Sequence, residues 1–209
     1  SDYYFKIPKA EDSKLWVDLT RIIRENNIDF VLPSFDGTLE EWSEKKECFR
    51  KENTEVIISP KETIKLFTDK WLTYNAFREA GLPSPKTSRK KKYSLVKPRK
   101  GRGSKGIKIT DNDLVNMDGY VSQEILEGQE LTVDCLFDKE GIPIYIIPRM
   151  RLKIIDGKSV DGKIVKNELV VSLIKKLAEK YHFIGPINIQ CFINSDGVSF
   201  IEVNPRIGG

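Results

Sequence analysis

The chain has 209 residues and a mass of 24.0 kDa, which is enough for one large domain or two small ones. Hydrophobic residues make up 39% of it and charged residues 32%, as expected for a buried core under a polar surface. No apolar run approaches the roughly 18–20 residues of a membrane span, so a membrane protein is not expected. The net charge of +4 is too small to argue by itself for a nucleic-acid partner.

The three cysteines, Cys48, Cys135 and Cys191, lie far apart and form no C-x-x-C pair. His182 is the only histidine that could join them as a nitrogen ligand, so a zinc site is not expected. Unpaired thiols are typical of a reducing compartment, and no signal peptide precedes the first strand-like residues. The sequence therefore predicts a cytoplasmic protein with free, mostly buried thiols and a structural histidine.

Residues 1–58 alternate between strand-like and helix-like patterns. Runs of apolar and β-branched residues indicate strands, and amphipathic spacing indicates helices. The expected strands are Tyr3–Ile7, Asp29–Ser34 and Thr54–Ser59, and the expected helices follow Asp12 or Ser13 and span Thr38–Lys51. This order predicts a small parallel sheet with helical crossovers, and its small size suggests that an N-terminal part is missing.

Two short helices are predicted after this unit. Ser59-Pro60 opens the first, Lys61–Phe67, because proline is favoured in the first turn. Asp69 is the expected N-cap of the second, Lys70–Glu79. A cation at the start of a helix is unfavourable against the helix dipole. Lys70 is therefore either the partner of an anion or an ordinary surface lysine.

A glycine-rich hairpin, Tyr93–Thr110, is the most distinctive stretch of the chain. Its ends, Ser94–Val96 and Ile107–Ile109, are strand-like. Between them lie three glycines and four cations: Gly101, Gly103, Gly106, Arg99, Lys100, Arg102 and Lys105, with Lys97 just before them. Glycines let a large anion approach the backbone closely, so the loop suits a polyphosphate. The G-x-G-x-x-G spacing is not a dinucleotide fingerprint, because a strand follows it where that fingerprint requires a helix.

The second half of the chain is predicted to be mostly antiparallel sheet. The expected strands are Tyr120–Leu126, Glu130–Phe137, Ile142–Leu152, Gly185–Asn194 and Val198–Val203, with one amphipathic helix at Asn167–Tyr181. Alternation along the second strand places Asp134 on the face opposite Leu131 and Val133. Asp134 is there either a site residue or a plain exposed residue.

The last hairpin carries a polar pattern that suits a metal ion. Glu202, Asn204 and Arg206 occupy every second position, so they point the same way in an extended strand. Gln190 of the paired strand can join them. A carboxylate with amide oxygens suits Mg²⁺ bridging phosphates, and an arginine counters phosphoryl charge. The alternative is the ordinary polar face of a half-exposed hairpin.

In this order, the motifs resemble the ATP-grasp superfamily, most closely the branch with the carbamoyl-phosphate synthase large subunit and related carboxylate–amine ligases. They are Asp69-Lys70, Val96-Lys97-Pro98, Gln123-Glu124, Gly128 to Asp134, Gly185 to Gln190, and Phe200 to Arg206. The resemblance implies an α/β (α+β) fold, with part of a Rossmann-like pre-ATP-grasp domain at 1–58 and an ATP-grasp domain at 59–209. It further implies a glycine-lid subdomain at about 83–119, a metal-binding subdomain at about 120–209, and a chain that is incomplete at its C-terminus.

The resemblance also implies roles for single residues. The residues implied to bind ATP are Lys70 and Lys97 at the phosphates, the main chain of Gly103 and Ser104 as a lid, Glu124, Ile125 and Leu126 at adenine, and Glu130 at the ribose. The implied Mg²⁺ ligands, for which Mn²⁺ is a substitute ion, are Gln190, Glu202 and Asn204. Arg206 is implied to stabilise the transferring phosphoryl group, and Arg149 to meet the substrate or an acyl phosphate.

The implied function is an ATP- and Mg²⁺-dependent ligase that activates a small carboxylate, or bicarbonate, for attack by an amine. Such chemistry depends on positioning and charge neutralisation, so it does not need a histidine base. Two alternatives stay open: an ATP-binding ATP-grasp protein without turnover, and a nucleic-acid binder using residues 86–108. The expected partners are ATP, a carboxylate and an amine, without nucleic acid or membrane, and a homo-oligomer is compatible with the sequence.

Overall fold

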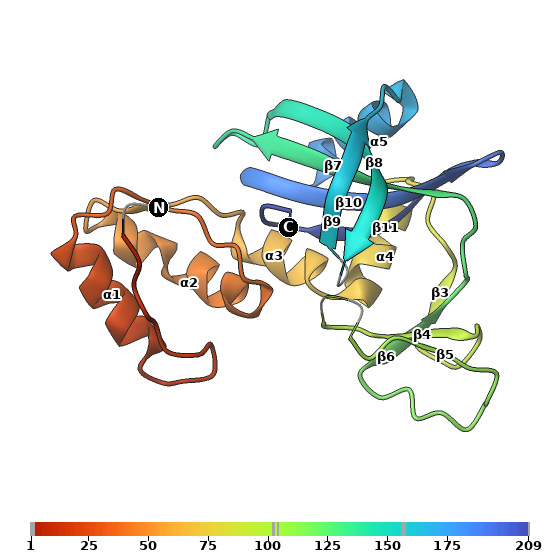
Figure 1. Cartoon of the computed structure of the whole chain (residues 1–209), viewed down its shortest axis with the longest axis horizontal. Coiled ribbons are helices and arrows are strands. Elements are labelled where there is room, and N and C mark those ends of the chain that lie inside the picture. Colours follow the sequence, from red (N-terminus) through yellow and green to blue (C-terminus); the bar gives the residue numbers. More distant parts are fainter. Residues whose placement is uncertain (1–2, 102, 104, 156–157, 209) are drawn as a thin grey trace.

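The computed structural model describes residues 3–101, 103, 105–155 and 158–208 of the chain. Four parts follow one another: an N-terminal α/β unit, a pair of short helices, a small four-stranded sheet, and a large five-stranded sheet with a covering helix. Figure 1 shows the N-terminal unit and the small sheet at opposite ends of the molecule, with the short helices and the large sheet between them.

The N-terminal unit is built on two parallel strands. These are β1 (Phe30–Val31) and β2 (Glu55–Val56). The connecting elements are α1 (Leu15–Glu25), η1 (Asp36–Thr38) and α2 (Leu39–Arg50). Their buried side chains form a separate small core that consists of Ile23, Leu39, Trp42, Phe49, Val56, Ile58 and Ile64. The two helices and the parallel pairing of the second and third predicted strands confirm that part of the predicted order.

The predicted strand Tyr3–Ile7 is wrong. Residues 3–9 have no regular structure, and Tyr3 and Tyr4 are 80% and 89% exposed. Strand propensity reflects packing against neighbours, and in the described sheets this segment has no partner strand. The strands predicted at Asp29–Ser34 and Thr54–Ser59 are shortened to two residues each, Phe30–Val31 and Glu55–Val56, which pair only with each other.

The two short helices begin and end where the sequence predicts. They are α3 (Lys61–Phe67) and α4 (Lys70–Glu79). The Asp69 carboxylate accepts hydrogen bonds from two backbone N–H groups in the first turn of α4, as an N-cap does. The same carboxylate accepts two bonds from Arg99, at 3.2 and 2.6 Å. Because Asp69 is only 4% exposed, one buried side chain joins α4 to the glycine-rich hairpin.

The small sheet holds the glycine-rich hairpin. Its strands, in spatial order, are β3 (Thr87–Ser88), β6 (Tyr120–Gln123), β4 (Leu95–Pro98) and β5 (Lys108–Ile109). β4 and β5 are antiparallel, as predicted. The sequence does not reveal β3, because two residues show no alternation. Gly106 has a φ of +76°, and a Cβ there would lie 2.9 Å from Pro98, so the turn between β4 and β5 requires glycine.

The large sheet is antiparallel, with the order β11-β10-β7-β8-β9. Its strands are β7 (Gln129–Phe137), β8 (Pro143–Ile155), β9 (Lys158–Ile164), β10 (Gly185–Asn194) and β11 (Gly197–Asn204). Apolar residues of α4 and α5 (Glu168–Lys180) pack on one face of the sheet and form the main core. The sequence does not predict β9, because glycine and charged residues interrupt its alternation.

The other face of the large sheet carries polar residues from three neighbouring strands. Between β10 and β11, Asn188 lies opposite Asn204 and Gln190 lies opposite Glu202. Between β10 and β7, Asn188 lies opposite Asp134. Directly opposed side chains point to the same face, so the register gathers these residues on one surface. The predicted placement of Asp134 opposite the core face is confirmed.

The three cysteines are free, and Cys135 and Cys191 are buried while Cys48 is exposed. Burial raises the pKa of the Cys191 thiol to about 12 and raises that of Cys135 as well, so both are protonated core residues at neutral pH. Within the described residues, no three His, Cys, Asp or Glu side chains gather as a metal site. No helix in that part of the chain is long and apolar enough to cross a membrane.

Asp69→Ala should destabilise the fold by about 2–4 kcal/mol, because it removes a helix cap and leaves the Arg99 guanidinium without its buried partner. Asp69→Asn should cost less, since an amide oxygen still caps α4. Urea unfolding measures both. Glu52→Ala is the matched control, because Glu52 also binds an arginine with both oxygens, but on the surface. Equal losses for Asp69→Ala and Glu52→Ala would contradict the role given to Asp69.

Candidate functional site

A pocket of about 460 Å³ opens between the N-terminal unit, α4 and the end of β11. Its lining includes Lys70, Glu202 and Asn204, three of the residues predicted to bind nucleotide or metal. The lining also contains Lys100 and Gly101 of the glycine-rich hairpin, and the N-terminal residues Asp36, Gly37, Glu40 and Glu41. Four distant parts of the sequence therefore meet at one opening.

Lys70 lies at the centre of this pocket. Its backbone N–H donates to the carbonyl of Arg99 at 2.9 Å, and its Nζ donates to the carbonyl of Gly101 at 3.1 Å. The same Nζ lies 3.5 Å from Oε1 of Glu202, and the Lys70 side chain is 17% exposed. Of the two interpretations left by the sequence, an ordinary surface lysine does not fit this burial. The ammonium instead joins the root of the hairpin to the predicted metal hairpin.

Lys97 is a half-buried cation close to Lys70 and Glu202. Its Nζ donates to the side-chain oxygen of Gln123 at 2.8 Å, and the Gln123 amide donates to Thr87 at 2.9 Å. Burial lowers the pKa of Lys97, and repulsion from Lys70 adds to this, whereas Glu202 and Glu130 act in the opposite direction. A phosphate group placed here would favour the charged form of Lys97.

The predicted metal ligands occupy neighbouring positions on β10 and β11. Gln190 and Glu202 are directly opposed, and Asn204 lies two residues beyond Glu202 on the same face. This set offers one carboxylate and two amide oxygens. Such a set fits Mg²⁺, which in nucleotide sites is bound through one or two carboxylates together with the phosphates of the substrate. It does not resemble an all-protein metal cage.

Two ion pairs follow next on the same face of the sheet. Glu130, predicted to bind the ribose, has Oε1 at 2.5 Å from Nη1 of Arg151. Arg149, predicted to meet the substrate, donates from Nε to Asp134 at 3.1 Å, and Asn188 donates to the other oxygen of Asp134 at 2.8 Å. The structure therefore places Arg149 one strand away from the metal hairpin, in a network with Asp134 and Asn188.

Arg206 is held by a residue that the sequence did not single out. Its Nε and Nη2 donate to the two oxygens of Asp36, at 2.7 and 3.0 Å, and Nη1 donates to the carbonyl of Ile207 at 2.7 Å. Asp36 begins η1, a few residues after β1 ends. The only available signal was this location, because ligands of open α/β sheets bind beyond the carboxyl ends of the strands.

The segment predicted to meet adenine lies away from the Lys70 pocket. Glu124, Ile125 and Leu126 line a different cavity of about 670 Å³, together with residues that include Tyr93 and Ser94. The Glu124 carboxylate accepts a bond from the backbone of Lys86 at 2.9 Å and lies 3.2 Å from its Nζ, an interaction that raises the pKa of Lys86.

The predicted lid residues give less information. Gly103 has a φ of +59°, and a Cβ there would meet no atom within 4 Å, so the backbone at this point is open to a ligand. Ser104 lies outside the described residues.

The sequence assigned no binding role to Gln123, and it associated Arg151 only with substrate specificity near Asp134 and Arg149. Each acts through a partner on another strand, which no short sequence motif reveals.

Lys97→Met should change the pH dependence of stability in one direction. A lowered pKa means that the unfolded chain binds the Lys97 proton more tightly than the folded chain does. Lys97 therefore lowers the free energy of unfolding of the wild type. This loss is complete below the lowered pKa and disappears as pH rises toward the ordinary pKa of 10.5. The stability of Lys97→Met relative to the wild type should therefore fall between pH 7.5 and pH 10 in urea unfolding. Lys139→Met, at an exposed turn residue, serves as the control, and an unchanged difference for Lys97→Met would contradict the assignment.

Comparisons with known proteins agree with this site and fold. A model of the ATP-grasp domain family matches residues 67–209. Tyramine–L-glutamate ligase of Methanocaldococcus jannaschii is 27% identical over 198 residues, which are 90% of this chain and 59% of that ligase. The chain therefore spans less than two thirds of the length of this relative.

Solved structures share the fold at low sequence identity. The L-amino acid ligase of Bacillus licheniformis superposes with a TM-score of 0.71 at 19% identity, covering 97% of this chain and 55% of that chain. The biotin carboxylase domain of Hydrogenobacter thermophilus 2-oxoglutarate carboxylase, solved with MgADP and bicarbonate, gives 0.73 at 17% identity, covering 98% and 54%. With the family match across most of its length, the chain belongs to the ATP-grasp domain family.

Proposed function

We propose that this chain is the nucleotide-binding part of an ATP- and Mg²⁺-dependent carboxylate–amine ligase. The observation that carries the proposal is the pocket in which Lys70, Glu202 and Asn204 meet below the root of the glycine-rich hairpin. The names of two similar proteins, a tyramine–L-glutamate ligase and an L-amino acid ligase, support a carboxylate and an amine as the substrate classes. The free thiols support a reducing, cytoplasmic location.

The phosphate end of ATP is assigned to the cations around the pocket. Lys70 and Lys97 neutralise phosphate oxygens, and the main chain of Gly101 and Gly103 covers them. Glu202, Asn204 and Gln190 hold Mg²⁺, for which Mn²⁺ is a substitute. When bound, the ion supplies charge neutralisation to the phosphate oxygens. The adenine and ribose are assigned to the segment 124–126 and to Glu130.

The reaction proceeds in two displacement steps. A carboxylate oxygen of the first substrate attacks the γ-phosphorus, the bond to the bridging oxygen of ADP breaks, and an acyl phosphate forms. The amine nitrogen then attacks the acyl carbon, the carbon–oxygen bond to phosphate breaks, and a proton leaves the nitrogen. Arg206 lies beside Asn204 in sequence and is assigned to the charge on the transferring phosphoryl group. Its rigid fork suits phosphoryl oxygens better than a lysine would.

A nucleic-acid function for residues 86–108 has less support. Several of the basic side chains there have acidic partners within the protein: Lys86 binds Glu124, Arg99 binds Asp69, and Lys100 lies 3.0 Å from Glu40. Cations engaged in this way add little to the salt-dependent contacts by which proteins bind phosphate backbones.

Millimolar Mg-ATP should raise the melting temperature of the chain by several degrees, because a ligand that binds only the folded state stabilises it. Glu202→Ala should abolish the part of this shift that depends on Mg²⁺. Asp196→Asn, in the turn of the same hairpin, should leave the shift unchanged. If Mg-ATP does not stabilise the wild-type chain, the proposed function is wrong. If Glu202→Ala retains the full Mg²⁺-dependent shift, the metal assignment is wrong.

Asp36→Asn and Arg206→Lys should each lower kcat by about tenfold or more, because both disturb the orientation of a charge that acts on the phosphoryl group. The Kd for Mg-ATP should change by about threefold or less, since Arg206 is assigned to the transition state. Phosphate release with panels of carboxylates and amines measures kcat, and calorimetry measures the Kd. Glu47→Gln, on the exposed side of α2, is the control. A loss of ATP affinity with unchanged kcat would contradict the role of Arg206.

A further inference from the structure

The short connection from α4 to the small sheet is hydrogen-bonded to both sheets. The carbonyl of Pro83 accepts from the backbone N–H of Phe200 in β11 at 2.8 Å. Further along the connection, Thr87 in β3 lies opposite Gln123 in β6. In Figure 1 the chain leaves α4 beside the large sheet and reaches the small sheet through β3. Because Phe200 is on the same strand as Glu202, the connection joins the strand of the predicted metal ligand to the small sheet.

A chain of hydrogen bonds crosses three neighbouring strands of the small sheet and ends on Lys97. The Thr87 hydroxyl of β3 donates to the carbonyl of Pro85 at 3.0 Å. The side-chain amide of Gln123 in β6 donates to the Thr87 hydroxyl at 2.9 Å. Nζ of Lys97 in β4 donates to the side-chain oxygen of Gln123 at 2.8 Å. Thr87 and Gln123 are each 7% exposed, so water does not readily replace a lost partner in this chain.

The donors and acceptors of this chain fix its direction. A hydroxyl has one proton, and the proton of Thr87 goes to Pro85, so the Thr87 oxygen can only accept from Gln123. The Gln123 amide must therefore turn its NH2 group to Thr87 and its oxygen to Lys97. An ammonium group has donors only, so Lys97 requires the same orientation. Two independent partners thus hold the Gln123 amide in one of its two possible orientations.

The charge of Lys97 depends on this acceptor. Burial is the main cause that lowers the pKa of Lys97; Glu202 acts against it, Lys70 adds to it, and Glu130 acts against it. Lys70 has Glu202 as an ion-pair partner, whereas the described residues place no carboxylate at ion-pair distance from Lys97. Gln123 thus supports the Lys97 ammonium with a neutral oxygen. The ammonium is held in place, and no direct ion pair within the described structure competes with a phosphate for it.

We propose that Thr87 is a positioning residue for nucleotide binding, which orients the ammonium of Lys97 toward the phosphates through the side chain of Gln123. This inference rests on the proposed function for the identity of the ligand. It adds two residues to the site and gives β3, a strand of two residues, a role in it. Because Thr87 is almost fully buried, it acts through Gln123 and Lys97 and not by its own contact with the nucleotide.

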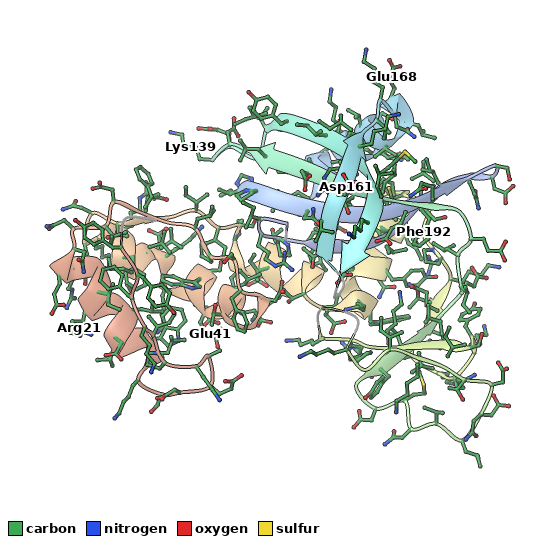
Figure 2. The ribbon with its side chains drawn as sticks, in the orientation of Figure 1. Arg21, Glu41, Lys139, Asp161, Glu168 and Phe192 are labelled. Carbon is green, nitrogen blue, oxygen red and sulfur yellow. The ribbon has the colours of Figure 1, made fainter. Side chains whose placement is uncertain are left out.

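Thr87→Val tests this chain of hydrogen bonds, because it removes the hydroxyl and keeps the shape of the side chain. The Kd for Mg-ATP, measured by calorimetry, should rise about fivefold, and Thr87→Ser, which keeps the hydroxyl, should stay within about twofold of the wild type. Thr54→Val is the matched control and should leave the Kd unchanged. The Thr54 hydroxyl is also buried and donates to the carbonyl of Ile28 at 2.8 Å. It belongs to the N-terminal unit, which Arg21 and Glu41 mark in Figure 2.

A second measurement needs no nucleotide. NMR of the chain with ¹³Cε-labelled lysine follows the titration of Lys97, and Lys97→Met identifies its signal. An acceptor on the ammonium favours its charged form, so Thr87→Val should lower the pKa of Lys97 further, by about 0.5 or more. Thr87→Ser and Thr54→Val should not lower it. Should Thr87→Val fail to fold, Gln123→Met, which removes the acceptor itself, should produce the same fall in pKa and the same loss of Mg-ATP affinity.

The two measurements separate this proposal from the proposed function. If the wild type binds Mg-ATP and a folded Thr87→Val or Gln123→Met variant binds it equally well, the proposal is overturned. An equal loss of affinity in Thr54→Val, or an unchanged titration of Lys97 in the folded variants, would overturn it as well. If the wild type does not bind Mg-ATP, the proposed function is wrong, and the titration still decides whether Thr87 acts on Lys97.

Discussion

The buried carboxylate of Asp69 fixes the geometry on which the nucleotide pocket depends. It caps α4, and it also accepts hydrogen bonds from Nε and Nη2 of Arg99 at the root of the glycine-rich hairpin. Lys70, the next residue, is thereby held between the hairpin and Glu202. A cation at the start of a helix is unfavourable in isolation, and the carboxylates on either side of it offset that cost. One buried acid therefore serves both the stability of the helix and the position of Lys70, the lysine that we propose binds phosphate.

Side chains alternate along the strands of the large sheet, so the residues of the core lie on one face and the candidate site residues lie on the other. Residues such as Leu131 and Val133 pack against α4 and α5, while the intervening residues form the polar face. Three cations at that face have acidic neighbours: Lys70 of α4 has Glu202, Arg151 has Glu130, and Arg149 has Asp134. Mutual compensation lets a highly charged surface stay close to neutral before phosphates arrive. Under the proposed function, substrate binding would exchange partners within the site without burying new uncompensated charge.

The sequence predicted the parts of this molecule that local interactions determine. Asp69 as the N-cap of α4 and Pro60 directly before α3 define the two helices to the residue. The two-residue period of the last hairpin correctly put Glu202 and Asn204 on one face. The features that the sequence did not predict correctly depend on contacts between residues that are distant in the sequence. Tyr3–Ile7 has strand propensity but no partner strand in the described structure. The Asp36–Arg206 pair joins residues 170 positions apart, so no motif contains both.

The N-terminal unit contributes to the site through two acids. Asp36 binds Arg206, and Glu40 of α2 lies 3.0 Å from Lys100 in the glycine-rich hairpin. The first contact fixes a residue assigned to catalysis, whereas the second holds part of the predicted lid at the edge of the pocket. The two pairs differ in burial, since Lys100 is 65% exposed and Arg206 is 17% exposed. An exposed pair is worth little and exchanges easily, so under the proposed function Lys100 can leave Glu40 for a phosphate while Arg206 keeps its orientation. The N-terminal unit thus makes one firmly held contact and one easily exchanged contact at the pocket.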